Sequence, residues 1–194
     1  MKVLIVNGSV REQQGSVNVA TWVEKTARQS MADTEVETLQ LKELDLPMFN
    51  EAVVPMMNKD RKSEGTVKQW LDAVQSADAF VFVTPEYNHG MPSGLKNAID
   101  YINYQIMHKP FLVVSHGANG GARAGEQLKQ VLNANIGGIP LPGSIAINGM
   151  VKYHDLISEE GEIIDEATKG NQKSLEGKLQ ELAWFAGALK NTEM

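Results

Sequence analysis

The chain has 194 residues, a formal net charge of −6 and no cysteine, and its length suits a single domain over residues 1–194. It has no basic run and no apolar stretch near the ~20 residues of a membrane helix, which argues against nucleic-acid and membrane partners. Without cysteine it offers no thiolate nucleophile, disulfide or Cys-bound metal, and it is compatible with a reducing compartment, so we expect a cytoplasmic protein.

Short apolar runs of strand-like length alternate with helical patterns along the chain. The runs lie at Lys2–Asn7, Ala79–Thr84, Pro110–His116 and Gly143–Asn148, with a weaker candidate at Glu35–Leu41. After each run, apolar residues recur at helical spacing, as in Val19, Trp22 and Val23 or in Leu175, Leu179 and Leu182. This order predicts an α/β fold in which a five-stranded parallel sheet lies between two layers of helices.

Two connections, 45–65 and 149–168, are too long to be simple linkers, and we expect them to be functional, interface-forming or mobile. The first carries apolar residues that predict packing against another surface, although its role stays open. In the second, Ser158–Asp165 indicates a solvated turn or hairpin. The run Tyr101–Met107, interpreted as a helix, is apolar around most of its circumference, which predicts a homo-oligomer.

The loop after the first strand, Asn7-Gly8-Ser9-Val10-Arg11-Glu12-Gln13-Gln14-Gly15-Ser16-Val17-Asn18, has the ingredients of a phosphate site. Open α/β sheets bind ligands beyond the carboxyl ends of their strands. Ser9, Ser16 and Asn18 can donate hydrogen bonds, and Arg11 adds a fixed charge before a helix N-terminus. The loop lacks GxGxxG and GxxxxGK[ST], so it suits one phosphate better than two or three. Alternatively, Ser16 is an N-cap and Ser9 a turn residue.

The loop after the third strand, Thr84-Pro85-Glu86-Tyr87-Asn88-His89-Gly90-Met91-Pro92-Ser93-Gly94, should lie at the same edge of the sheet. Pro85 stiffens its entry, and Tyr87 can stack on a ring or donate its hydroxyl. The N–H groups of Glu86 to Asn88 could reach the carbonyls and nitrogens of a flat heteroaromatic ring. The alternative is a structural strand-to-helix turn.

Taken together, GSxR…GSxN near the start and PEYN…PxGLKNAID in the middle resemble the NAD(P)H-dependent FMN reductase family, whose relatives include small quinone, azo-dye and chromate reductases. The resemblance runs from Val3 to about Ile147. It implies a flavodoxin-like three-layer sandwich with strand order 2-1-3-4-5. It also implies FMN as cofactor, NADPH or NADH as electron donor, and a homodimer or homotetramer.

The same resemblance implies a set of cofactor-binding residues in three segments. The phosphate segment has polar Gln13 and Gln14 where a Ser-rich version is typical, so some phosphate contacts stay open. The second segment would line the isoalloxazine ring, and the third would place backbone N–H groups near the charge of reduced flavin. The implied residues are Ser9, Arg11, Ser16, Val17 and Asn18; Pro85, Glu86, Tyr87 and Asn88; and His116, Gly117, Gly120 and Gly121.

The implied activity is hydride transfer from NAD(P)H through flavin to a quinone, flavin, azo compound or similar acceptor. We expect no catalytic side chain, because the cofactor performs the chemistry. We also expect no metal, since the four histidines lack ligand spacing and suit surface or loop positions, although His89 and His116 adjoin the flavin loops. Alternatives are a flavodoxin-type electron carrier without nicotinamide turnover and a flavin-free regulatory or scaffold protein. The acceptor, NADPH against NADH, and dimer against tetramer stay open.

Overall fold

The computed structural model describes residues 1–12, 15–58, 60–134, 136–149, 156–166 and 168–190. Its strands are β1 (Lys2–Asn7), β2 (Glu35–Gln40), β3 (Ala79–Pro85), β4 (Pro110–Gly117), β5 (Ile139–Pro140) and β6 (Ile145–Asn148). Its helices are α1 (Ser16–Ser30), α2 (Leu41–Leu44), α3 (Gly65–Ser76), α4 (Ser93–Asp100), α5 (Ala122–Ala134) and α6 (Lys169–Lys190), with a 3₁₀ turn η1 at Pro55–Met57.

The strands form one parallel sheet in the order β2-β1-β3-β4-β5, and β6 pairs with β4 beyond β5. The predicted flavodoxin-like α/β sandwich and its strand order are therefore confirmed. The strand predicted at Gly143–Asn148 is β6, which pairs with the last four residues of β4, whereas β5, which pairs with Pro110 and Phe111, was not predicted. Between them, Pro142 has no N–H to donate and Gly143 has a φ of +75°, so the chain leaves the ladder there.

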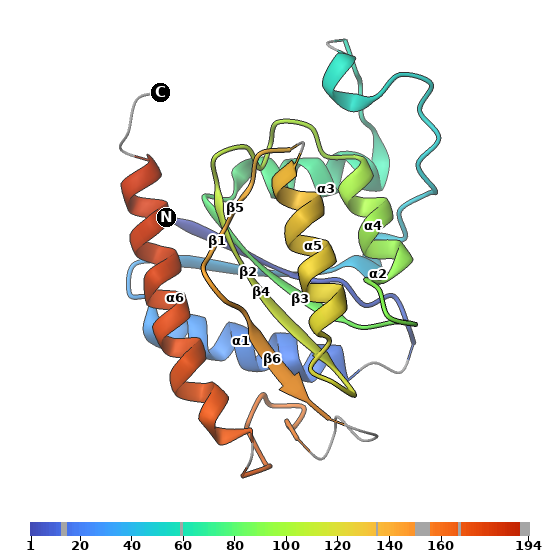
Figure 1. Ribbon diagram of the computed structural model, residues 1–194. Coiled ribbons are helices and arrows are strands. Elements are labelled where there is room, and N and C mark those ends of the chain that lie inside the picture. Colours follow the sequence, from blue (N-terminus) through green and yellow to red (C-terminus); the bar gives the residue numbers. More distant parts are fainter. Residues whose placement is uncertain (13–14, 59, 135, 150–155, 167, 191–194) are drawn as a thin grey trace.

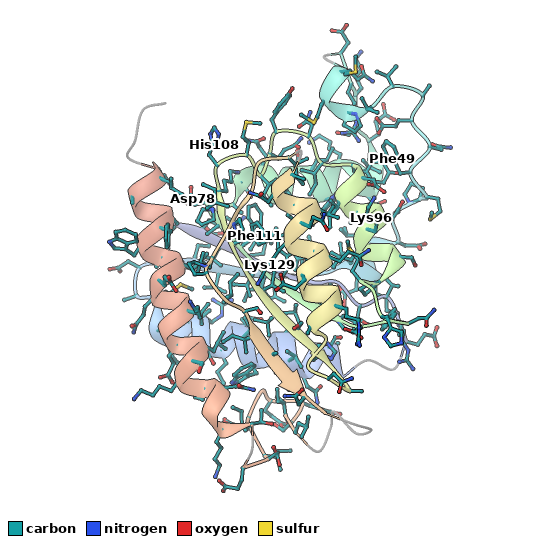
Figure 2. The ribbon with its side chains drawn as sticks, viewed as in Figure 1. Phe49, Asp78, Lys96, His108, Phe111 and Lys129 are labelled. Carbon is teal, nitrogen blue, oxygen red and sulfur yellow. The ribbon has the colours of Figure 1, made fainter. Side chains whose placement is uncertain are left out.

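Alternation along the strands divides the core into two layers. In β4, Leu112 and Val114 pack with α1 and α6, whereas Phe111 and Val113 pack with α3, α4 and α5. Figure 1 shows α1 and α6 on one face of the sheet and α3, α4 and α5 on the opposite face. Phe111 lies between the strands and α5 in Figure 2. Every residue of β3 and β4 is buried, as expected of central parallel strands.

The interpretation of Tyr101–Met107 as a helix is wrong. Helix α4 ends at Asp100, and the Arg61 guanidinium donates from Nη1 to the Tyr101 carbonyl at 2.6 Å, which holds the chain in its turn. Tyr101, Ile102 and Ile106 are buried in the chain's own core, and Tyr104 is half exposed. The apolar side chains of this run therefore pack mainly within the chain's own core, and the run no longer indicates an oligomer.

The connection after α2 begins on the core and then leaves it. The Asn97 side chain on α4 accepts from the Phe49 N–H and donates to the Pro47 carbonyl, both at 2.8 Å, and Phe49 lies beside α4 in Figure 2. Further along, this segment projects from the body of the fold (Figure 1). Its predicted packing is thus only partly seen, because several apolar side chains are exposed: Met48, Val53, Val54 and Met57.

The C-terminal connection contains the predicted hairpin. Ile157 and Ile163 form an antiparallel bridge, and Ser158 N donates to the Glu162 carbonyl at 2.8 Å. Buried Ile157 fixes this turn against the α1 and α6 layer of the core. None of the helices within the described ranges is long and apolar enough to cross a membrane.

Candidate functional site

The loops that follow β1, β3 and β4 meet at the carboxyl edge of the sheet, at the lower right of Figure 1. Two side-chain hydrogen bonds join them. The hydroxyls of Ser9 and Tyr87 share one of 2.8 Å, and Ser16 Oγ lies 2.6 Å from His116 Nε2. The structure thus brings together the three segments that the sequence predicts as a site.

Asn7, which the sequence analysis did not select, anchors the loop after β1. It is fully buried at the end of the strand, where its Oδ1 accepts from Ser9 N at 3.3 Å. Its Nδ2 donates to Gln40 Oε1 at 2.6 Å, which ties the loop to the end of β2. The signal was present in the sequence: an amide side chain closes an otherwise apolar strand, and such a group is buried only when it is hydrogen-bonded.

Helix α1 begins at Ser16 with an open N-terminus. Gly15 is its N-cap, and among the described residues no side chain caps the helix. No acidic residue lies in the first turn. The suggestion that Ser16 is an N-cap is therefore wrong, because Ser16 is the first helical residue and its hydroxyl meets His116. The N–H groups of the first turn, which no described side chain caps, and the positive helix end suit an anion.

The other predicted phosphate-loop residues have different surroundings. Arg11 is exposed, with its guanidinium 5.9 Å from the centre of the Tyr87 ring. Val17 is half-buried in the first turn of α1. Asn18 is buried, and its Nδ2 donates to the Ile157 carbonyl at 2.8 Å, so its amide joins α1 to the C-terminal hairpin. Gln13 and Gln14 lie outside the described residues.

A two-residue hairpin turn follows β3. Tyr87 and Gly90 exchange backbone hydrogen bonds of 2.9 and 3.1 Å, while Asn88 and His89 have φ of 45° and 67°. Positive φ at both central residues is the signature of a type I′ turn. Glu86 N donates to the His116 carbonyl at 3.1 Å. Of the three N–H groups predicted to face a ring, two are thus already used, and only that of Asn88 has no acceptor within the described ranges.

The Glu86 side chain connects the hairpin to helix α5. Its carboxylate is 12% exposed and accepts from Arg123 N at 3.0 Å, Ala124 N at 3.4 Å and Arg123 Nη1 at 3.2 Å. It therefore caps a helix that begins at Ala122 without a Ser, Thr, Asn or Asp of its own before it. Sequence reasoning assigned Glu86 a backbone role and missed this one.

Glycines shape the loop after β4. Gly120 and Gly121 have φ of +69° and +67°, and a Cβ on Gly121 would lie 2.7 Å from the His116 carbonyl oxygen. Ser115 Oγ donates to the Gly120 carbonyl at 2.7 Å, which fixes the turn. The N–H groups of the next residues after Gly117, at positions 118 and 119, have no acceptor in the described part of the chain. They are therefore available as donors to the oxygen or nitrogen atoms of a ligand.

His116 is buried in β4, 2% exposed, and not at the surface or in a loop as predicted. Burial lowers its pKa to about 4, so the imidazole is neutral at pH 7. His89 and His108 are exposed, as predicted, and His154 lies outside the described residues. Within the described ranges, no group of three or more His, Asp and Glu side chains could hold a metal ion.

Comparison with known proteins gives one consistent result. Residues 1–151 match the family model described as NADPH-dependent FMN reductase. The chain is 38% identical over 130 residues to an NAD(P)H-dependent FMN reductase of Schizosaccharomyces pombe, matching 67% of this chain and 64% of that protein. It is 34% identical over 166 residues to an NAD(P)H-dependent FMN reductase of Saccharomyces cerevisiae, covering 75% and 87% of the two chains.

A quinone reductase of Escherichia coli is 30% identical over 177 residues, with 87% of each chain covered. Among solved structures, the flavoenzyme NAD(P)H:(acceptor) oxidoreductase FerB from Paracoccus denitrificans has a TM-score of 0.73 at 23% identity, over 96% of this chain and 97% of that one. An FMN-dependent NADH-azoreductase of Bacillus anthracis in complex with FMN has a TM-score of 0.60 at 16% identity, over 94% and 100%. These two likenesses concern the fold.

Proposed function

Because the chain belongs to the NADPH-dependent FMN reductase family, we propose that it binds FMN where the loops after β1, β3 and β4 meet and passes electrons from NADPH or NADH to a small acceptor. The pair of hydrogen bonds that joins these loops, Ser9 to Tyr87 and Ser16 to His116, is the observation that carries the proposal. A quinone, a flavin or an azo compound is the class of acceptor we propose, supported by the names of the relatives.

The loop after β1 fits a phosphate monoester. Ser16 brings a hydroxyl to the start of α1, whose N-terminus carries no described side-chain cap and no acid in its first turn. Ser9 adds a hydroxyl from the loop itself, beside Tyr87. Arg11 is exposed beside Tyr87 and free to fold over an anion. Backbone N–H groups, a helix dipole and a guanidinium together favour a doubly charged phosphate. Asn18 would act indirectly, by holding α1 against the C-terminal hairpin.

The other two loops fit a flat ring with polar edges. The N–H groups of Asn88 and of the residues after Gly117 have no acceptor among the described residues, so they can donate to ring oxygens and nitrogens. Tyr87 supplies an aromatic surface next to Ser9. Gly120 and Gly121 keep side chains away from the edge. Pro85 and His116 are paired in the β3–β4 ladder, which fixes the spacing of the two loops.

When bound, FMN would supply the chemistry, because it can take a hydride from the nicotinamide and return the electrons to an acceptor. The chain's own task is then to orient the ring and to stabilise negative charge on it with backbone donors. No described side chain in the three loops needs to act as a general acid or base for this. His116 is a neutral, buried residue of strand β4, and it transfers no proton in the proposed reaction.

The direct test is a visible spectrum of the purified protein with and without added FMN, followed by anaerobic addition of NADPH and then NADH. We expect a bound flavin band that bleaches with at least one nicotinamide and returns on addition of a quinone or azo dye. A bound flavin that neither nicotinamide bleaches would indicate a flavodoxin-type carrier. A colourless protein that takes up no FMN would reject the proposal.

We further propose that the chain forms a homodimer or homotetramer. The support is the projecting segment after α2, where Met48, Val53, Val54 and Met57 are exposed, and not the Tyr101–Met107 run from which the sequence argument started. Apolar side chains clustered on one projecting segment are typical of contact surfaces. A monomer mass that does not change with concentration in analytical ultracentrifugation would exclude this.

A further inference from the structure

One polar residue interrupts the apolar layer beneath α1. Along β4, Leu112, Val114 and His116 alternate onto the α1 face, and the first two are fully buried core residues. A third apolar side chain would continue this layer. His116 is instead a buried imidazole whose pKa burial lowers to about 4, a placement that disfavours any charged form. Burying such a group costs free energy unless it is hydrogen-bonded.

The hydrogen bond that His116 makes leads to the proposed phosphate site. Its Nε2 lies 2.6 Å from Ser16 Oγ, and Ser16 is itself 2% exposed, at the first residue of α1. The direction of the Ser16 hydroxyl proton therefore depends on which atom of this pair donates.

The two directions have opposite consequences for an anion. A serine hydroxyl has one proton and two lone pairs, while a neutral imidazole has one N–H and one bare nitrogen. If Ser16 donates to Nε2, its lone pairs face the loop, and they repel phosphate oxygens. If Nε2–H donates to Ser16 Oγ, the hydroxyl proton is available to a phosphate oxygen, which can only accept.

We propose that His116 is a positioning residue for the cofactor phosphate, its Nε2–H donating to Ser16 Oγ so that the Ser16 hydroxyl proton points to a phosphate oxygen. This inference rests on the proposed function and adds to it a residue that does not itself touch the cofactor. Gly121 supports the arrangement, because its lack of a side chain lets the glycine loop pack directly on the His116 backbone. His116 thus contributes to recognition of the phosphate and not of the flavin ring.

The test compares FMN with riboflavin, which has the same ring and no phosphate. Dissociation constants for both are measured by flavin fluorescence on flavin-depleted wild type and on His116→Gln, His116→Leu and Ser16→Ala. We expect His116→Leu and Ser16→Ala each to weaken FMN binding roughly 10-fold, the scale of one charge-assisted hydrogen bond, with riboflavin unchanged. His116→Gln, which can place an amide N–H near the Nε2 position, should retain most of the preference.

The double variant Ser16→Ala with His116→Leu should lose no more than either single variant, since both act through one hydrogen bond. Equal weakening of FMN and riboflavin by His116→Leu, or no weakening of either, would overturn the proposal. A wild-type protein that binds neither flavin would instead reject the proposed function itself.

Nitrogen-15 NMR of the wild type bound to FMN provides a readout that needs no variant to fold. We expect His116 as the tautomer with its proton on Nε2. A proton on Nδ1 alone would refute the role assigned to His116, whatever the variants do.

Discussion

Replacing His116 by Gln should change how the protein's stability responds to acid. The folded-state pKa of His116 is lowered to about 4, against 6.5 for an ordinary histidine. Between these values the unfolded chain binds a proton that the folded chain does not, so acid favours unfolding. The stabilisation is complete above pH 6.5 and is lost as the pH falls towards 4. Glutamine does not titrate, so His116→Gln should lack this component.

The size follows from the two pKa values. A difference of 6.5 − 4 = 2.5 units at ~1.36 kcal/mol per unit amounts to about 3 kcal/mol over the full range. Between pH 7.5 and pH 5, the loss from this one group is about 2 kcal/mol, because the folded state is still almost unprotonated at pH 5. All other groups titrate alike in the wild type and in His116→Gln. The effect of His116 therefore appears in the difference between the unfolding free energies of the two proteins.

Urea unfolding of both flavin-depleted proteins, followed by the fluorescence of buried Trp22 and Trp70, measures that difference. The free energy of unfolding of His116→Gln minus that of wild type should rise by about 2 kcal/mol from pH 7.5 to pH 5. A difference that stays constant over this range would refute the reasoning, since it would mean that His116 titrates normally in the folded protein.

Three further predictions follow from the loops. Gly121→Ala should lower the free energy of unfolding in urea by at least ~2 kcal/mol more than Gly65→Ala. Both glycines have positive φ, but a Cβ on Gly65 has nothing within 4 Å. Equal losses would contradict the predicted contact between a Cβ at position 121 and the His116 backbone. Glu86→Ala should cost about 1–2 kcal/mol in the same measurement by uncapping α5, and Glu86→Gln less; a neutral Glu86→Ala would disprove the cap. His89→Gly should raise the melting temperature through a gain of up to about 1 kcal/mol, because glycine suits the second central position of a type I′ turn, and a fall would argue against that turn.

Much of the fold could be predicted because apolar runs and helical spacing are local signals. Strand β1 has the predicted bounds, and a helix lies at the pattern predicted after each run, although the pattern that starts at Leu95 extends to Ile102, beyond the end of α4 at Asp100. The signals fail where tertiary contacts decide. The apolar run after Asp100 has helical composition, yet Arg61 binds the Tyr101 carbonyl and the chain turns. The short helix α2 has too few residues for a periodic pattern to show.

That the three loops of the candidate site meet could be predicted as well, since parallel strands end at a common edge. The internal connections of the site could not. The contact between Ser16 and His116 spans 100 residues, and the one between Ser9 and Tyr87 spans 78. Alternation along β4 does put His116 on the face of Leu112 and Val114, so its burial was available from the sequence. Its treatment as a surface or loop residue came from residue type alone.

The complete burial of β3 and β4 also has a consequence for the proposed binding of flavin. Both strands are covered up to their last residues, Pro85 and Gly117, from which the two loops proposed to face the flavin ring start. Pro85 has no amide proton, but the amide protons of Thr84 and Gly117 should exchange with solvent about as slowly as those in mid-strand, even without flavin. Binding of FMN would then order little of the β3 and β4 edge. The heat-capacity change of FMN binding should therefore correspond to the surface that the flavin covers, without a contribution from folding of the protein.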